Sequence, residues 1–336
     1  MMTKQRHTNT VLLLIVLACS MLKLTLSCGQ QNDGEQWRHT PKRAVYHWKT
    51  TYAPTEKEKR FLADHKVGRI YIHYFDVAFR DGVIQPEGTV RFKEEPSVNL
   101  EVVPTVYITI EALRAMHNEI ERRFEGNEYV YNEYAEKIVR RVKAMNKHNA
   151  VANVHELQLD CDWTSRLRDD YFGLLAAVRS ILHDDDLQLS VTIRLHQLND
   201  VAPPADMGVL MLYNTGNLMS ENTHNSILDV KDARPYLNAA WPYILPLDFA
   251  YPDFGWQVVY KDGKFVRLAS PKEKVEDEGV RVRNEQADYA TILKVKGLAE
   301  NKLWEDGFSS AIIYHLDEQF LDKFTDEQIE KIYGDR

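Results

Sequence analysis

The stretches Glu156–Asp162, ELQLDCD, and Leu187–His196, LQLSVTIRLH, decide the fold, because polar and apolar residues alternate strictly in both. Side chains two apart on a strand point to the same face, so each strand has one polar and one apolar face. In a closed barrel the apolar faces pack under helices and the polar faces line the interior. An antiparallel sheet with one solvated face gives the same alternation. The long helical segments between the strands disfavour that alternative.

Strand-like and helix-like segments alternate along the rest of the chain, which is typical of an α/β fold with a parallel sheet. Capping boxes at Thr55 and Thr325 predict two helix starts, and further helices are expected at 128–146 and 171–183. The eight expected strands are 44–49, 69–76, 102–108, 154–162, 187–196, 208–214, 243–248 and 310–315. These units predict a single (β/α)8 barrel of the TIM type.

Two further features define the expected barrel. The segment around Lys261–Lys264 predicts a β-hairpin over 258–268, inserted after the seventh strand. No Gly-rich phosphate loop follows the first strand, which disfavours a dinucleotide-binding fold. We therefore expect one barrel domain over residues 44–336.

The first 28 residues have the parts of a bacterial secretory signal. Residues 11–22 form an uncharged, mostly apolar run that is too short to span a bilayer. The small residue before Cys28 resembles a lipobox, after which Cys28 carries acyl chains, and Cys19 is a competing match. An ordinary signal peptide or an uncleaved anchor is the remaining alternative. We expect lipidation at Cys28, a polar tether over 29–43, and a lipid-anchored protein of the bacterial cell envelope.

The charge and the cysteine content indicate which partners and which stabilising bonds to expect. The net charge is −8 with both signs interspersed, so the chain carries no nucleic-acid footprint. Two of the three cysteines lie in the leader and leave Cys161 alone in the folded part, so the domain is expected to be free of disulfides. Stability then depends on a large core. We expect a monomer that needs no cofactor.

Two short motifs carry a family resemblance. Leu159–Thr164, LDCDWT, resembles the fourth-strand signature of family-18 glycoside hydrolases, the chitinase-like barrels, which runs Asp-x-Asp-x-Glu. Met211–Asn214, MLYN, is similar to the Met-x-Tyr-Asp motif of the same clan. The chain also resembles uncharacterised exported bacterial barrel proteins that carry an Asp-x-Asp strand without the glutamate.

The resemblance implies roles for the matching residues. Asp160 and Asp162 would be the paired aspartates of the catalytic strand, with Asp162 orienting a substrate acetamido group and Tyr213 lining the same subsite. The position of the catalytic acid holds Thr164, and a threonine cannot protonate a leaving group at neutral pH. Asn214 likewise replaces an aspartate. The mechanism that the family implies therefore lacks its acid.

A hydrolase would need an acid from the end of another strand. Glycoside cleavage requires two carboxyl groups, or one acid and a substrate acetamide, and barrel sites collect residues from several strand ends. Hydrolysis therefore predicts a second carboxyl group roughly 5–10 Å from Asp162. Each candidate is also explained as an ordinary helix cap or loop residue. The candidates are Asp76, Asp248, Asp317 and Glu318.

Aromatic residues gather near the predicted strand ends, where they offer a platform for the apolar face of a sugar; some of these rings would simply pack between strands and helices. Strict alternation predicts that Trp163 points away from the pocket and that His47, not its neighbour Trp48, points inward. The expected pocket centres on Asp160 and Asp162. The substrate-binding residues expected around that pair are Tyr213, Asn214, Arg194, His196, His47, Tyr107, Asp76 and Asp248.

Three functions remain open on the sequence. A carbohydrate-active protein is favoured, either a glycoside hydrolase with a displaced acid or a non-catalytic binder of a glycan or peptidoglycan-type ligand. A metal-dependent hydrolase is the third, because five histidines lie in or beside strands, but no metal-ligand spacing appears. A purely structural protein would close the Asp160–Asp162 face with ion pairs, for instance to Arg194, and leave no cavity.

Overall fold

The computed structural model describes residues 40–122, 127–239, 243–275, 279–303 and 309–334. The predicted leader, Cys19, Cys28 and most of the tether lie outside these residues. Within the described residues, no helix combines the length and the apolar character needed to cross a membrane.

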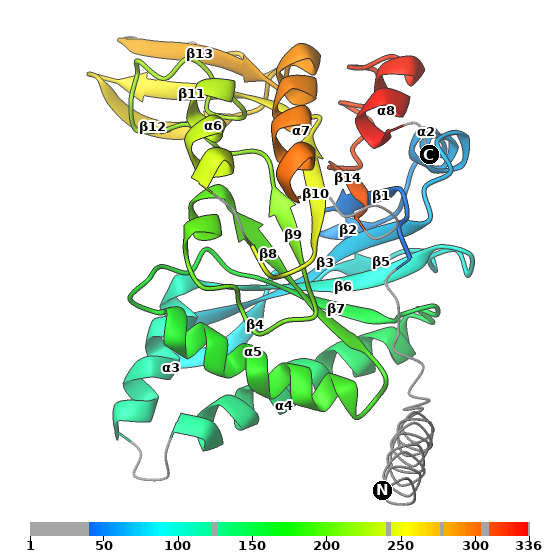
Figure 1. Ribbon diagram of the computed structural model, residues 1–336, viewed down its shortest axis with the longest axis vertical. Helices are drawn as coiled ribbons and strands as arrows, with labels where there is room; N and C mark the ends of the chain where they lie inside the picture. The colour runs from blue at the N-terminus through cyan, green and yellow to red at the C-terminus, as the bar shows by residue number, and fades with distance from the viewer. Residues whose placement is uncertain (1–39, 123–126, 240–242, 276–278, 304–308, 335–336) are drawn as a thin grey trace, which may run out of the picture. The chain divides into compact units, whose positions relative to one another are not determined.

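Eight parallel strands close into a barrel (Figure 1). The first strand pairs in parallel with both the last strand and the second one, which completes the ring. This confirms the predicted (β/α)8 barrel and excludes the antiparallel alternative. The barrel strands are β1 (Ala44–His47), β3 (Arg69–Arg80), β6 (Glu101–Ile108), β7 (Glu156–Asp160), β8 (Gln188–Arg194), β9 (Met207–Met211), β10 (Leu247–Pro252) and β14 (Ala311–Tyr314).

Helices connect most of the barrel strands. Thr55 and Thr325 cap α2 and α8 through the predicted capping boxes. The β8–β9 connection is an exception, because among its residues only the short 3₁₀ helix η1 (Leu195–Asn199) forms. The helices are α2 (Glu56–Asp64), α3 (Ile110–Arg122), α4 (Asn127–His148), α5 (Arg168–His183), α6 (Val230–Ala239), α7 (Tyr289–Leu303) and α8 (Asp326–Tyr333).

The segment after β10 folds into a small antiparallel sheet. β11 (Gly255–Lys261) and β12 (Lys264–Ala269) form the predicted hairpin, whose turn residues Asp262 and Gly263 both have positive φ. The prediction missed β13 (Val280–Gln286), which pairs along the other side of β11. In Figure 1 this sheet lies at one end of the barrel domain, beside α6.

Short strands also border the other side of the barrel. The long strand β3 continues into an antiparallel pairing with β4 (Val83–Glu87). The two-residue strands β2 (Thr51–Tyr52) and β5 (Arg91–Phe92) pair with each other. They bring the segment that follows β1 next to the segment that follows β4.

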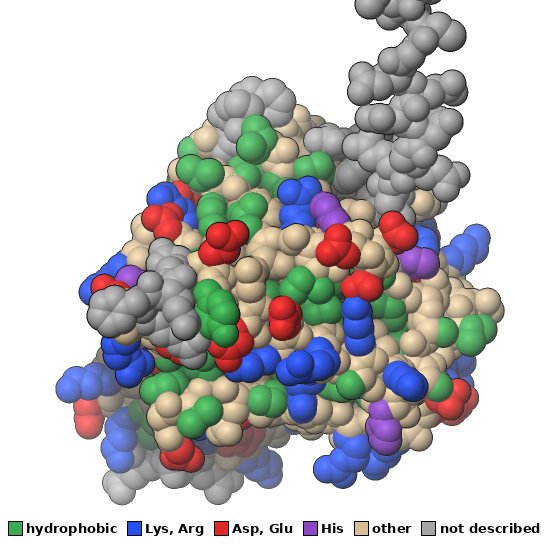
Figure 2. Space-filling view, turned by 90° about the horizontal axis from the view of Figure 1, so that it is seen from below, with side chains coloured by type: hydrophobic (Ala, Val, Ile, Leu, Met, Phe, Trp, Pro, Cys, Tyr) green, Lys and Arg blue, Asp and Glu red, His purple; other side chains and the backbone are tan. Residues whose placement is uncertain are grey.

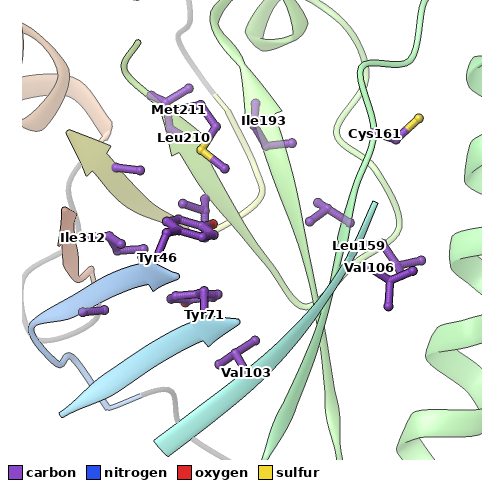
Figure 3. Close-up of a cluster of buried hydrophobic side chains, with 14 of the residues drawn as sticks. Tyr46, Tyr71, Val103, Val106, Leu159, Cys161, Ile193, Leu210, Met211 and Ile312 are labelled. Carbon is purple, nitrogen blue, oxygen red and sulfur yellow. The ribbon is translucent and has the colours of Figure 1, made fainter. Parts of the chain in front are cut away.

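Polar side chains line the barrel interior as the alternation predicts. Gln158 of β7 accepts a hydrogen bond from the Tyr46 hydroxyl at 2.8 Å and donates one to the Ser190 hydroxyl at 3.2 Å. Tyr46 and Tyr71 stack with their ring centroids 4.8 Å apart (Figure 3). These bonds satisfy groups that would otherwise be buried at a cost.

The apolar faces of the strands pack outward under the helices. Leu159 and Ile193 are fully buried, and they belong to the cluster drawn in Figure 3. The outer surface is mixed in charge, and the face shown in Figure 2 carries acidic and basic side chains side by side.

Candidate functional site

A cleft of about 450 Å³ opens where the barrel strands end at their carboxyl side. We call it the mouth cleft. Side chains from the ends of seven barrel strands and from the loops that follow them line it, as expected for a barrel site. Its lining residues are Trp48, Thr50, His73, Asp76, Gly88, Tyr107, Asp160, Asp162, Arg194, Met211, Tyr213, Asn214 and Tyr314.

Arg194 joins the two aspartates of the fourth barrel strand. Its guanidinium donates to Asp160 Oδ1 at 3.2 Å and also to Asp162. Thr192, two residues earlier on β8, donates its hydroxyl to Asp160 Oδ1 at 2.5 Å. The ion pairs expected of a purely structural protein are therefore present, but the cavity is present as well.

The two aspartates differ in their surroundings. Asp160 is 4% exposed, and burial raises its pKa above the usual value, although Arg194, Thr192 and His73 each offset part of that effect. The Asp162 side chain is half exposed at the cleft surface. Asp160 therefore holds Arg194 in place from below, and Asp162 presents the oxygen atoms that a ligand meets.

Asp76 faces this pair from the second barrel strand. The register places Asp76 beside Tyr107, and Tyr107 beside Asp160, on three neighbouring parallel strands. Because neighbouring strands lie about 4.8 Å apart, the Cα atoms of Asp76 and Asp160 are about 10 Å apart. The mouth cleft therefore contains a carboxyl group in addition to those of Asp160 and Asp162.

A β-bulge turns Asp76 toward the cleft. The pairing of β3 with β6 shifts register between His73 and Phe75, which adds one residue to β3 and reverses the alternation beyond it. His73 and Asp76 therefore both line the cleft, and His73 Nε2 lies 2.7 Å from Asp76 Oδ1. Asp76 was predicted as a site residue, whereas His73 was considered only among the five strand histidines of a possible metal site.

Aromatic rings form much of the cleft wall. Trp48 packs on His73 with ring centroids 4.6 Å apart, and Tyr213 stacks on Tyr314 at 4.7 Å. Tyr107 completes the set from β6. Tyr314, which belongs to the last barrel strand, was missed because nothing in its local sequence separates it from a core residue.

A second lobe of about 290 Å³ adjoins the mouth cleft. It shares Asp162, Arg194, Tyr213 and Asn214 with the main lobe, and His196 from η1 adds a wall. Burial lowers the pKa of His196, so its imidazole is neutral at neutral pH. The remaining lining residues are Leu195, Thr215 and Tyr236.

Two predicted binding residues lie away from the cleft. His47 points outward and packs on Tyr52, because its neighbour Tyr46 occupies the interior. Trp48, two residues after Tyr46, lies on the same face as Tyr46 and reaches the cleft, so the predicted alternation had the wrong phase. Asp248 lies at the amino end of β10, where its carboxylate accepts from the Ser310 amide and faces Arg69. The prediction placed that strand at 243–248 instead of 247–252, so Asp248 was assigned to the wrong end.

The remaining residues that were considered from the sequence lie outside the mouth cleft. Trp163 is 1% exposed and points away from the cleft, as predicted. Thr164, at the position of the family's acid, is exposed and lies outside the cleft lining. Asp317 lies near Lys49, and the Glu318 amide donates to Glu58, so neither lines the cleft.

Metal binding receives no support from the described residues, among which no three His, Cys, Asp or Glu side chains gather as a possible metal site. Among the five histidines near strands, His47 and His315 lie close to each other and share Lys49 as a neighbour. His73 pairs with Asp76, and His47 and His315 are buried, with pKa values lowered by burial to about 3 and about 4.

Comparison with solved structures places the fold. A chitinase from Chromobacterium violaceum ATCC 12472 matches 88% of this chain over 100% of its own, with a TM-score of 0.54 and 10% identity. The GH18 chitinase ChiB of Flavobacterium johnsoniae matches 88% of this chain and 94% of its own, with a TM-score of 0.53 and 12% identity. This is a chitinase-like barrel fold.

A third similar structure comes from a different kind of enzyme. The spore cortex-lytic enzyme SleL of Bacillus megaterium QM B1551 matches 83% of this chain and 71% of its own, with a TM-score of 0.52 and 15% identity. No protein-family model and no curated protein matches the sequence. At these identities the likeness establishes a glycoside hydrolase-like barrel and nothing finer.

Proposed function

We propose that this protein is an exported, lipid-anchored protein of the bacterial cell envelope that binds a glycan in the mouth cleft. The observation that carries this proposal is the wall of the cleft, where the rings of Trp48, Tyr107 and Tyr314 stand beside the charged groups of Asp162 and Arg194. Rings pack on the apolar face of a pyranose, and charged groups bind its hydroxyls. The leader, with Cys28 as the acylated residue, supports the location.

The Arg194 contacts favour binding over the family's own mechanism. That mechanism uses a strand-four acid, and Thr164 occupies its position. Asp160 and Asp162 are both engaged by one guanidinium, so neither is free to donate a proton. The fold neighbours named as a chitinase and as a cortex-lytic enzyme support two kinds of glycan as probes, chitin oligosaccharides and peptidoglycan strands.

We expect the full-length chain in detergent to bind one of these two probes. Trp48→Ala should weaken that binding by about ten- to a hundredfold. The reason is that burying the apolar surface of a large side chain contributes roughly 1.5–3 kcal/mol. The affinity is measured by titration calorimetry with an N-acetylglucosamine hexamer and with soluble peptidoglycan glycan strands. Asp162→Asn should also weaken binding, whereas Trp163→Phe, which lies outside the cleft, should not. Equal affinities for wild type and Trp48→Ala would contradict the proposed site.

Hydrolysis with a displaced acid is the second candidate, and the position of Asp76 favours it. A protonated Asp76 would donate to the glycosidic oxygen as the C1–oxygen bond breaks. Water would then add its hydroxyl to C1, and its remaining proton would pass to Asp162, the carboxylate on the opposite side. His73, bonded to Asp76, is placed to hold that carboxyl in position.

Asp76→Asn tests the second candidate. General acid catalysis contributes roughly 10²–10⁴-fold, so we expect release of reducing ends to fall by at least a hundredfold while affinity for the same glycan changes little. His73→Gln should lower the rate less and shift its pH profile, because the acid remains. If the wild-type protein binds glycan without releasing reducing ends, the proposal of hydrolysis is wrong and the proposal of glycan binding remains.

A further inference from the structure

A separate cavity of about 540 Å³ lies between the inserted sheet and the loop that follows β14. We call it the insertion cavity. Trp256, Phe320 and Pro271 supply apolar walls, and three amide side chains stand among them. The lining residues are Gly255, Trp256, Pro271, Lys272, Asn284, Glu285, Gln286, Gln319, Phe320, Asp322 and Lys323. None of them lines the mouth cleft.

The acidic groups of this cavity already have partners. Glu285 accepts from Arg283 at 2.6 Å and from the Trp256 indole at 2.8 Å. Asp322 pairs with Lys57 at 2.5 Å. Their negative charges are therefore offset by cations that stand outside the lining.

The lining also holds two lysines, Lys272 and Lys323, of which Lys323 is the more buried. The Lys323 ammonium donates to the Phe254 carbonyl at 2.9 Å, and among the described residues no carboxylate lies within 4 Å of it. Burial lowers its pKa to about 8, although Asp253 and Asp288 lie near enough to raise it. Asp288 is held by Thr291 at the start of α7, and Asp253 has its pKa raised by burial to about 7, so its charge is only partial.

Aromatic rings connect this cavity to the mouth cleft. The Trp256 ring lies 5.1 Å from that of Phe254, and the Phe254 ring lies 5.6 Å from that of Tyr314, a residue of the cleft wall. Trp256 and Tyr314 are thus at most about 11 Å apart. The two cavities are therefore separated by a distance that a few sugar units span.

We propose that the insertion cavity binds a carboxylate-bearing sugar unit of the glycan, with Lys323 as the residue that binds the carboxylate. A single ammonium matches a single negative charge, the amides of Asn284, Gln286 and Gln319 bind further oxygens, and Trp256 packs on the ring. The inference rests on the proposed glycan-binding function and names its ligand more narrowly, as an acidic glycan. Two sources carry this chemistry, the lactyl group of N-acetylmuramic acid and the carboxylate of a uronic acid.

The test compares one glycan with and without its charge. Peptidoglycan glycan strands are titrated into the full-length chain, first with their lactyl carboxylates intact and then after conversion of these to methylamides. We expect amidation to weaken binding at least tenfold. Lys323→Met should weaken binding of the intact strands to the same degree and leave the amidated strands unaffected. Lys143→Met removes a surface lysine of α4 that pairs with Asp185, and this variant should bind both kinds of strand as the wild type does.

A second variant and a second ligand keep the test decisive. Gln286→Glu places a carboxylate in the cavity at an exposed position and should weaken binding of the intact strands at least tenfold more than binding of the amidated strands. It replaces Lys323→Met if that variant fails to fold. If oligogalacturonate binds and its binding depends on Lys323 to the same degree, a uronic acid is identified as the source of the carboxylate. If only binding of the peptidoglycan strands depends on Lys323, the lactyl group is identified as the source.

The inference and the proposed function fail in different ways. Equal affinities of wild type for intact and amidated strands, or a charge preference that survives in both Lys323→Met and Gln286→Glu, would overturn the inference. The protein would still bind a glycan probe in that case, and that binding would still depend on Trp48. Loss of all glycan binding would instead remove the proposed function.

Discussion

Replacing Arg194 with methionine is expected to lower the free energy of unfolding by about 3–5 kcal/mol, because removing one partner of a buried ion pair leaves an uncompensated charge. Asp160 is 4% exposed and would keep the Thr192 hydroxyl as its only remaining strong partner among those described. Urea unfolding of the full-length chain at pH 7, followed by tryptophan fluorescence, measures the loss.

Two variants separate this effect from ordinary loss of packing. Arg168→Met removes a partly exposed arginine that pairs with Asp169 and Asp200, and it should leave the stability almost unchanged. Arg194→Met combined with Asp160→Asn should recover at least half of the lost stability, because the stranded charge is then absent. If the double variant is no more stable than Arg194→Met alone, charge compensation is not the reason for the loss.

Asp253→Asn is expected to stabilise the protein at alkaline pH and to have little effect in acid. Asp253 is 3% exposed at the end of β10, and burial raises its pKa from 3.8 to about 7. Between these pH values the folded state keeps a proton that the unfolded state releases, so stability falls as pH rises. At about 1.4 kcal/mol for each pKa unit, the gain from Asn at pH 8 is about 4 kcal/mol.

The pH dependence of the difference identifies its cause. The Asn side-chain oxygen still accepts the His315 amide hydrogen that Asp253 Oδ1 accepts at 2.7 Å. The stability difference between Asp253→Asn and wild type should therefore grow from near zero at pH 4 to its full value above pH 7. Asp184→Asn, at an exposed helix end, serves as the control substitution. A flat difference for Asp253→Asn would show that its carboxyl titrates normally.

The sequence predicted the barrel because polar and apolar residues alternate strictly in the segments that form β7 and β8. The two alternating stretches were placed within a few residues of β7 and β8, and Gln158, Asp160, Thr192 and Arg194 point to the interior as expected. The capping boxes located α2 and α8. Period-two alternation and helix caps are local signals, so a single sequence is enough to read them.

The site was predicted less completely, because local rules fail at strand ends. The β-bulge in β3 brought His73 and Asp76 to one face, although residues three apart on a regular strand point to opposite faces. β10 begins four residues later than predicted, which moved Asp248 to the far end of the barrel and left Asp253 at the carboxyl end. The alternation along β1 was assigned the wrong phase, because Tyr46 points into the barrel and Trp48, not His47, shares its face.

The sequence by itself determined the fold class and the strand that carries Asp160 and Asp162, since both depend on patterns within one segment. Only the tertiary structure decided which residues meet at the barrel mouth. Asp76, Tyr107 and Asp160 come from three strands far apart in the chain, and closure of the barrel sets their register. Lys323 and Trp256 likewise meet through the packing of an inserted sheet on a distant loop. Such contacts have no signature in a single segment, because the free energy that fixes them comes from packing between segments.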